Sequence, residues 1–407
     1  MRVVPGIIAA ILALSLGKGF VRAQTSDRWL YDLHMFDTQT GWAEGAKGRG
    51  GVFPMGAEPS IVRTSDGGVH WKDVTPQAPP GQQIGYNAFA IHPLTALRAW
   101  IRTPGGSQTA DPGKPDSDVL FHTLNGGETW SSAIIPRNSV PISPASFGWF
   151  IDFINARDGW LASGNDIYRS ADGGKTWITV GSAKSPCRTQ YTARSPIQSI
   201  AFLNATTGWI TGYCDDGVGI YHLLTLDGGH TWQQQKLSLP PQLTRAAGAL
   251  RIYQPSPGGP AIPRGPQFVT AQDGVFPAVY GTNQAAGAFF YVTHDGGMTW
   301  MYTAPVTLTE GRTAGGGLWS NYQSSTFADA SHGWVTDGRA LYVTRDGGRR
   351  WAKILLSLPF DRLLGEIDFV SPRVGWATGQ ASQIPFLLKT LDGGYTWTPV
   401  AYTVSPR

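Results

Sequence analysis

The chain has 407 residues, of which 41% are hydrophobic and 15% are charged, and it contains 52 glycines and 29 prolines. Disordered chains need more charge and fewer aromatic residues, so this composition excludes them and favours many short strands joined by turns. The formal net charge of +4 comes without a basic run of the kind that follows nucleic-acid phosphates, so we expect no nucleic-acid partner.

Residues 1–23 have the pattern of a signal peptide. Arg2 gives a positive start, residues 7–16 form an apolar run, and residues 21–23 (Val-Arg-Ala) form a plausible cleavage site. The run is too short to span a bilayer, and an uncleaved anchor is the alternative. Cleavage would remove three basic residues and no acid, leaving 29 bases against 28 acids. We therefore expect an exported, nearly neutral protein with no stable membrane insertion after cleavage.

A motif of eight residues, the Asp box, recurs seven times along the rest of the chain. Each copy reads Thr or Ser, any residue, Asp or Asn, Gly-Gly, any two residues and Trp. The residues at its third position are Asp66, Asn125, Asp172, Asp227, Asp295, Asp346 and Asp392. Repeats of about 50 residues with several short strands each are typical of β-propeller blades.

A second signature, a short apolar strand followed by Gly-Trp, precedes most boxes. The pairs are Gly41-Trp42, Gly159-Trp160, Gly208-Trp209, Gly333-Trp334 and Gly375-Trp376, while Ala99-Trp100 and Gly274-Val275 fill the other two places. Each unit thus offers an apolar strand A, a strand B starting at Gly-Trp, a strand C running into the box and a strand D starting at the box Trp. We predict an all-β fold, a single seven-bladed β-propeller over residues 28–400. Each blade should have four antiparallel strands, with the Asp-box turn between strands C and D. Both chain ends coincide with a blade boundary, which leaves the closure of the ring unspecified.

The third residue of each box has a structural interpretation. Asp before Gly-Gly is a hairpin-turn signal because glycine accepts a positive φ, and the carboxylate and the Thr or Ser hydroxyl can bond to the turn backbone. One acid per blade is spread around a ring, so these residues cannot converge on one catalytic or metal site. We expect no cofactor and no metal.

Strand A supplies a further repeated position, eight residues before the Gly-Trp tryptophan. The residues there are polar or small, as expected beside a narrow central channel, and blade 2 does not align cleanly: His34, Asp152, Ala201, Gln267, Thr326 and Asp368. The next residue is apolar and should pack between blades. Asp152, Asp368 and His34 are candidates for acid–base catalysis, with a solvated structural role as the alternative. His34 and Asp368 lie on neighbouring blades and could pair.

Propeller topology divides the connections between two faces. Boxes and A–B turns share one face and are short, whereas B–C and D–A connections share the other and vary in length, so we expect the binding surface on this loop face. Its long segments carry aromatic residues of types enriched in protein interfaces: Tyr253, Trp319, Tyr322 and Phe360. On the box face, adjacent blades carry arginines that could bind an anionic partner or merely face solvent: Arg345, Arg349, Arg350 and Arg373.

The chain has two cysteines, Cys187 and Cys214. An even pair in an exported chain favours one disulfide, and two buried free thiols are the alternative. CxxC spacing is absent, so neither a zinc site nor thioredoxin-like redox chemistry is supported.

The boxes match the Asp-box, or bacterial neuraminidase, repeat. Seven boxes with upstream Phe-x-x-x-x-x-Gly-Trp units resemble the photosystem II stability and assembly factor-like propellers over about residues 28–400. This resemblance implies a non-enzymatic scaffold or assembly factor that meets a protein partner, such as a membrane-protein intermediate, through a basic surface patch. It also implies export to the periplasm or outside the cell, or to the thylakoid lumen in a photosynthetic organism. The four arginines are candidates for the patch.

A glycan-binding or glycoside-hydrolysing propeller is the alternative, because sialidases share the boxes. Sialidases are similar in the boxes alone: they have six blades, and their Arg-Ile-Pro signature is replaced here by the changed order Ile262-Pro-Arg264. Xyloglucanase-type enzymes use two such propellers, and this chain has length for one. A hydrolase would need two carboxylates about 5–9.5 Å apart, and the sequence offers no compact acidic pair. We therefore expect a binding protein rather than an enzyme.

Overall fold

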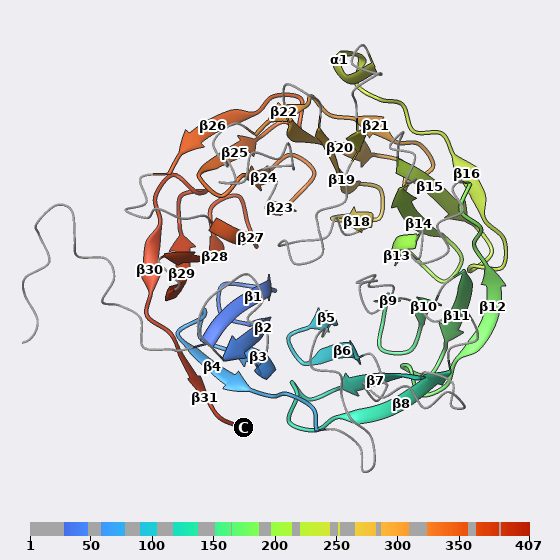
Figure 1. Ribbon diagram of the computed structural model, residues 1–407, viewed down its shortest axis with the longest axis horizontal. Coiled ribbons are helices and arrows are strands. Elements are labelled where there is room, and N and C mark those ends of the chain that lie inside the picture. Colours follow the sequence, from blue (N-terminus) through green and yellow to red (C-terminus); the bar gives the residue numbers. More distant parts are fainter. Residues whose placement is uncertain are drawn as a thin grey trace, which may run out of the picture.

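The computed structural model describes residues 28–47, 58–77, 90–103, 117–136, 151–163, 165–186, 197–213, 220–244, 251–252, 265–281, 286–308, 324–356, 364–381 and 384–407. Their strands form seven antiparallel sheets, arranged as blades around a common centre with strand A of each blade innermost (Figure 1). The predicted all-β, seven-bladed propeller with four antiparallel strands per blade is confirmed.

Blades 1 to 4 follow one another along the chain and share one strand order. From the centre outward, blade 1 contains β1 (Arg28–Met35), β2 (Gly41–Lys47), β3 (Glu58–Thr64) and β4 (His70–Asp73). Blade 2 contains β5 (Ala90–Thr95), β6 (Arg98–Thr103), β7 (Ser117–Thr123) and β8 (Ser131–Pro136). Blade 3 contains β9 (Ile151–Phe153), β10 (Gly159–Ser163), β11 (Asp166–Ser170) and β12 (Ile178–Ser182). Blade 4 contains β13 (Ile197–Phe202), β14 (Gly208–Tyr213), β15 (Ile220–Thr225) and β16 (Gln233–Gln235).

Blade 5 departs from this pattern, and blades 6 and 7 return to it. A short helix, α1 (Pro241–Thr244), precedes blade 5. Blade 5 has six strands: β17 (Arg251–Ile252), β18 (Gln267–Phe268), β19 (Gly274–Gly281), β20 (Ala286–Thr293), β21 (Met301–Tyr302) and β22 (Val306–Thr307). Blade 6 contains β23 (Ser324–Phe327), β24 (Gly333–Thr336), β25 (Ala340–Thr344) and β26 (Ala352–Leu355). Blade 7 contains β27 (Leu364–Phe369), β28 (Gly375–Ala381), β29 (Ile384–Thr390) and β30 (Thr398–Val400). Strand D begins one residue after the box Trp, and not at it as predicted, except in blade 1.

The ring is closed by the C-terminal strand, which the sequence did not specify. Strand β31 (Thr403–Ser405) pairs in parallel with β4, so blade 1 gains a fifth strand on its outer edge (Figure 1). The Thr403 N–H donates to the carbonyl of Val69 at 3.0 Å. Tyr402, 1% exposed, donates its hydroxyl to the carbonyl of Arg28 at 2.5 Å. The propeller therefore extends beyond residue 400.

The core lies between the blades, where strand A of one blade meets the Gly-Trp of the blade before. Phe153 stacks on Trp100 with ring centroids 3.9 Å apart, and Phe202 stacks on Trp160 at 3.8 Å. The predicted packing of this apolar position between blades is confirmed. Glycine before the Trp is required because a Cβ on Gly159 would lie 2.4 Å from the ring of Phe153.

Candidate functional site

The Asp boxes use their side chains inside the turn. In box 3, Ser170 Oγ donates to Asp172 Oδ1 at 2.9 Å and accepts the Gly174 N–H at 2.8 Å. Thr176 donates its N–H to Oδ1 at 3.0 Å and its hydroxyl to Oδ2 at 2.6 Å. Burial acts to raise the pKa of Asp172, but these hydrogen bonds outweigh it and lower the pKa to about 2. The carboxylate is thus ionised and occupied by its own turn, which leaves it little capacity for chemistry.

Each box also rests on the A–B turn of its own blade. In box 3 the Gly173 N–H donates to the carbonyl of Arg157 at 2.9 Å, and the other six boxes make the equivalent bond. Gly173 has a φ of +81°, and a Cβ there would lie 2.8 Å from the carbonyl oxygen of Ala156. The turn itself is fixed by a side chain, since Asn155 Oδ1 accepts the N–H groups of Arg157 and Asp158. The box face is therefore a rigid surface tied together by backbone hydrogen bonds.

The two channel aspartates bind the backbone of the following blade. Asp152 Oδ2 accepts the N–H of Phe202 at 2.6 Å, and Asp368 Oδ2 accepts the N–H of Met35 at 2.5 Å. Burial raises the pKa of Asp152, against the lowering effects of His92 and of the N–H groups that it accepts. Their strands, β9 and β27, lie on opposite sides of the centre (Figure 1). The structure does not bring these two carboxylates together, and it gives each of them a linking contact between blades.

Blade 2 contributes a residue to this column that the sequence interpretation missed. His92 pairs with Trp100 across β5 and β6, as Asp152 pairs with Trp160 across β9 and β10. Its Nε2 lies 3.1 Å from the N–H of Phe153 and 3.5 Å from Asp152 Oδ1. His92 lies eight residues before Trp100, the spacing that defines this column, and this spacing could have identified it. It was obscured because strand A of blade 2 continues with proline in place of an aromatic residue.

His34 occupies the predicted position on β1. It pairs with Trp42 across β1 and β2, and its ring contacts Phe36 edge-on with centroids 4.7 Å apart. The equivalent of Phe153 in the next blade is Pro93, which has no N–H to donate. His34 therefore cannot make the contact that His92 makes.

The four arginines of the box face lie on blades 6 and 7, as predicted, and all are exposed. Arg345 Nη2 donates to the hydroxyl of Tyr395 in box 7 at 3.1 Å, and its guanidinium lies 5.7 Å from the centre of that ring. The carbonyl of Arg373 accepts the N–H of Gly393, also in box 7. Leu391 and Tyr395 of the same box are 63% and 52% exposed. We call Arg345, Arg349, Arg350, Arg373, Leu391 and Tyr395 the arginine sector.

The arginine sector carries no ion pair with any other part of the chain that the structure describes. Salt bridges elsewhere on the box face, such as Lys72 with Glu128 at 3.3 Å, show that acids are available to basic residues in other blades. An exposed guanidinium without a carboxylate keeps its five donors for a partner, and it can bind carboxylates in a bidentate manner.

Several predicted site residues lie outside the described residues, and their predictions stand as made. They are the loop-face aromatics Tyr253, Trp319, Tyr322 and Phe360, the cysteines Cys187 and Cys214, and the signal peptide. Among the residues that are described, no group of three or more His, Cys, Asp or Glu side chains is placed to hold a metal ion. No helix in those ranges is long and apolar enough to cross a membrane.

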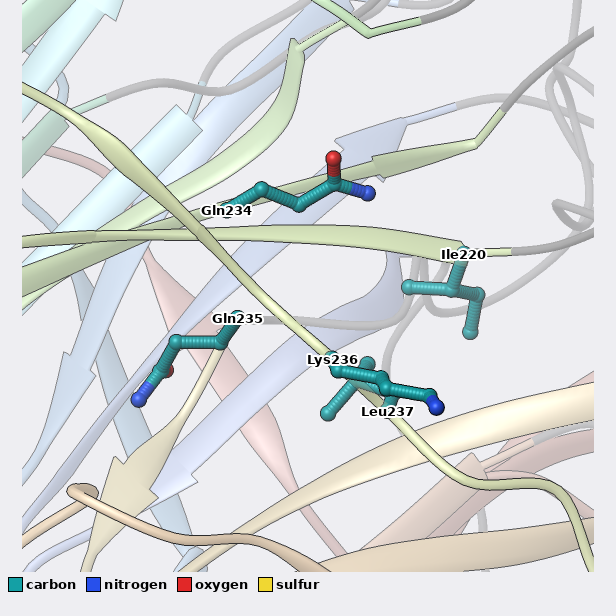
Figure 2. Close-up of a pocket in the computed structure, with 5 residues that line it drawn as sticks. All are labelled: Ile220, Gln234, Gln235, Lys236 and Leu237. Atoms are coloured by element: carbon teal, nitrogen blue, oxygen red, sulfur yellow. The ribbon is translucent and has the colours of Figure 1, made fainter.

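A pocket of about 370 Å³ lies beside β16, the outermost strand of blade 4 (Figure 2). Its lining residues come from the start of β15 and from β16 and the chain that follows: Ile220, Gln234, Gln235, Lys236 and Leu237. The lining contains no carboxylate, so this pocket does not offer the acid pair of a glycosidase.

Comparison with known proteins gives fold neighbours only. No protein-family model matches the sequence, and no curated protein matches it. A structure titled "YCF48 bound to D1 peptide" is similar with a TM-score of 0.51 and 16% identity, covering 90% of this chain and 93% of that chain. YCF48 from Cyanidioschyzon merolae has a TM-score of 0.50 and 16% identity, covering 91% and 98%. The GH74 xyloglucanase from Xanthomonas campestris has a TM-score of 0.54 and 14% identity, covering 93% of this chain but 54% of the enzyme.

Proposed function

We propose that the protein is a non-enzymatic, exported scaffold that binds another protein through the box face. The observation that carries this proposal is the arginine sector: four exposed arginines that form no salt bridge among the described residues, beside exposed Leu391 and Tyr395. Exposed guanidinium groups next to exposed apolar side chains are suited to an acidic protein segment, because charge speeds association and apolar contact prolongs it.

The fold neighbours support a protein partner over a small metabolite. One neighbour is described as bound to a peptide, and it covers nearly the whole ring of this chain. At 16% identity this likeness concerns the fold, so the partner's chemistry rests on the arginine sector itself. The loop-face residues Trp319 and Tyr322 remain proposed contacts, and their truncation should shorten the lifetime of a complex without slowing its formation.

A glycan-active propeller is the second candidate, because the xyloglucanase is similar over 93% of this chain. The geometry of the channel acids weighs against hydrolysis. Asp152 and Asp368 each accept a backbone N–H from the next blade, so both carboxylates are engaged in contacts between blades. Turnover of a β-glucan or sialoside by the mature protein, lost on Asp152→Asn or Asp368→Asn, would favour this candidate over the scaffold.

The test begins with crosslinking of the tagged mature protein in its own membrane fraction, followed by identification of the captured protein. Association and dissociation rates are then measured with that purified partner at two ionic strengths. The double variant Arg349→Glu/Arg350→Glu should lower the association rate about tenfold at low salt and flatten its salt dependence.

Lys175→Glu is the matched control, because Lys175 follows Gly-Gly in box 3 as Arg349 does in box 6. It reverses an exposed charge at the equivalent place on another blade. Equal effects of the Lys175 and Arg349/Arg350 variants on the association rate would show that charge anywhere on the box face affects association. If the double variant left both the association and the dissociation rate unchanged, the arginine sector would not be part of the binding surface.

A further inference from the structure

At most of the interfaces between adjacent blades, which we call seams, an indole hydrogen bond joins (fastens) the two blades. The Gly-Trp tryptophan donates Nε1–H to the first glycine carbonyl of the box in the next blade. This bond links Trp100 to Gly173, Trp160 to Gly228, Trp334 to Gly393 and Trp376 to Gly67, at 2.9–3.0 Å. At the seam of blades 1 and 2, Trp42 donates to the carbonyl of Thr95 instead. At the seam of blades 4 and 5, Nε1 of Trp209 is buried without a partner, and at the next seam Val275 replaces the tryptophan.

The channel column fastens three of these four seams from the inside. His92, Asp152 and Asp368 each reach a backbone N–H of the following blade. In blades 4 and 5 the equivalent residues are Ala201 and Gln267. No bond of this kind reaches Phe268 or Phe327 from any residue that the structure describes, so both seams of blade 5 lack it.

A third column, the residue before each box, also differs between the blades. Its members face the Gly-Trp position across strands B and C, and in blades 1, 2, 3 and 7 they are basic: Arg63, His122, Arg169 and Lys389. Arg63 Nε donates to the carbonyl of Ala96 in blade 2 at 2.7 Å, and the Lys389 ammonium lies 4.6 Å from the ring centre of Trp376. In blades 4, 5 and 6 the column is apolar: Leu224, Val292 and Val343.

At both of its seams, blade 5 thus lacks the indole bond, the channel-column bond and the basic residue before the box. Its inner strand, β18, is only two residues long. The two sides are not equivalent. Toward blade 6, the Ala304 N–H donates to the carbonyl of Gly348 at 3.0 Å, and Trp351 Nε1 donates to the carbonyl of Ala304 at 3.1 Å. Toward blade 4, the polar contacts of the described side chains are those of Gln235, whose Nε2 donates to the carbonyls of Gly297 and Met298.

The seam of blades 4 and 5 also holds a concentration of buried polar atoms without partners. They are Ser199 Oγ, Trp209 Nε1, His222 Nε2, Gln235 Oε1 and Trp300 Nε1. The rings are in contact, with centroids 5.5 Å apart for His222 and Trp300 and 6.2 Å apart for Trp209 and Trp300. Buried polar groups without partners destabilise the closed state, and opening would let water satisfy them.

We propose that the propeller has a built-in opening seam between blades 4 and 5. Among the described residues, separation of the two blades there breaks only the two hydrogen bonds of Gln235 and hydrates the five unpaired atoms. It exposes an uncharged cleft walled by Trp209, His222 and Trp300. The pocket of Figure 2 lies at the outer end of this seam, because Ile220 and Leu237, which line it, also pack against the Trp209–Trp300 cluster. Opening gives the ring a place to adjust its circumference, whichever partner it binds.

Hydrogen exchange of the full-length protein tests the proposal. The strand-B amides of β14 and β19 should exchange about tenfold faster than the equivalent amides of β10 and β28, whose seams carry the indole bonds. Equal or slower exchange at β14 and β19 would overturn the proposal.

Two substitutions introduce, at the seam of blades 4 and 5, an interblade contact that other seams have. Ala201→Asp supplies a carboxylate for the N–H of Phe268, as Asp152 does for Phe202. Leu224→Arg places a guanidinium at the position from which Arg63 donates to a backbone carbonyl of the next blade. Each should slow exchange at β14 and β19 about fivefold. Thr326→Asp, which adds the same carboxylate to the column at the seam of blades 6 and 7, should leave β14 and β19 unchanged. If a folded restoring variant left exchange at this seam unaltered, the missing fastenings would not be the cause of opening. Should both variants fail to fold, the comparison within the wild-type protein decides the matter.

Discussion

The Asp368 carboxylate of the last blade accepts the backbone N–H of Met35 in the first blade at 2.5 Å. The two residues are 333 positions apart, and their bond joins the inner strands of the blades where the ring closes. Its neighbour Glu366 repeats the contact, accepting the N–H of Leu33 at 2.9 Å. Two carboxylates thus hold β1 against β27, in a part of the ring that sequence proximity cannot fix.

Removing the carboxylate of Asp368 should destabilise the whole propeller. We expect Asp368→Ala to lower the free energy of unfolding by about 1–3 kcal/mol, because it leaves the Met35 N–H without its charged acceptor. Guanidinium denaturation measures the change. Thr326→Ala is the control: it alters the same column in blade 6, where no hydrogen bond to another described residue is lost. Equal losses in the two variants would mean that the column stabilises through packing alone.

The box carboxylates make stability depend on acid. Burial acts to raise the pKa of Asp227, but hydrogen bonds from Thr231 and Thr225 outweigh it and lower the pKa from 3.8 to about 2. A lowered folded-state pKa adds stability above pH 3.8, and this stability is lost as the pH falls toward 2. Asp227→Ala should cost about 1 kcal/mol at neutral pH through loss of the turn cap.

The chain supplies its own control for this prediction. Asn125 occupies the same place in box 2, where its Oδ1 accepts the Thr129 N–H at 3.0 Å and its Nδ2 donates to the Thr129 hydroxyl at 2.9 Å. Asp227→Asn should therefore retain most of the stability at neutral pH. It should remove the contribution that Asp227 makes to the loss of stability in acid. A box variant that kept full stability but abolished binding of a partner would make the boxes functional rather than structural.

The sequence predicts the fold well because each blade repeats its local signals. Glycines of the boxes adopt positive φ, and the Phe–Trp stacks follow from the spacing of strand A and Gly-Trp. The closing strand could not be predicted, since Thr403–Ser405 carries no repeated residue and pairs with a strand more than 300 positions away. The hydrogen-bond donors of Asp152 and Asp368 could not be predicted either, because these N–H groups belong to another blade and depend on the geometry of the ring. His92 was predictable from its spacing, but Pro93 hid the alignment.

His222 should make the protein sensitive to mild acid. It is fully buried, and burial lowers its pKa from 6.5 to about 3. The unfolded chain binds a proton at that histidine below pH 6.5 while the folded protein does not, so stability should fall as the pH falls from 6.5 toward 3. The expected slope is about 1.4 kcal/mol for each pH unit. His222→Phe should remove this slope in denaturation curves recorded at several pH values, whereas His230→Gln, at an exposed box histidine, should leave it in place.

The C-terminal segment should be essential to the closed ring. Tyr402 is buried in the cluster that joins blades 7 and 1, Thr403 begins the strand paired with β4, and Arg407 Nη1 donates to the carbonyl of Thr75 at 2.6 Å. Deleting residues 401–407 removes the side chain of Tyr402 and the fifth strand together. Loss of a buried aromatic side chain alone costs about 3–5 kcal/mol, so the truncated protein should melt well below the intact one. Tyr402→Phe removes only the bond to the Arg28 carbonyl and should cost about 1 kcal/mol. Calorimetry of the three proteins separates the contribution of the hydroxyl from the combined contribution of the aromatic ring and the strand. A truncated protein that melted with the intact one would show that the contacts between β1 and β27 close the propeller without the strand.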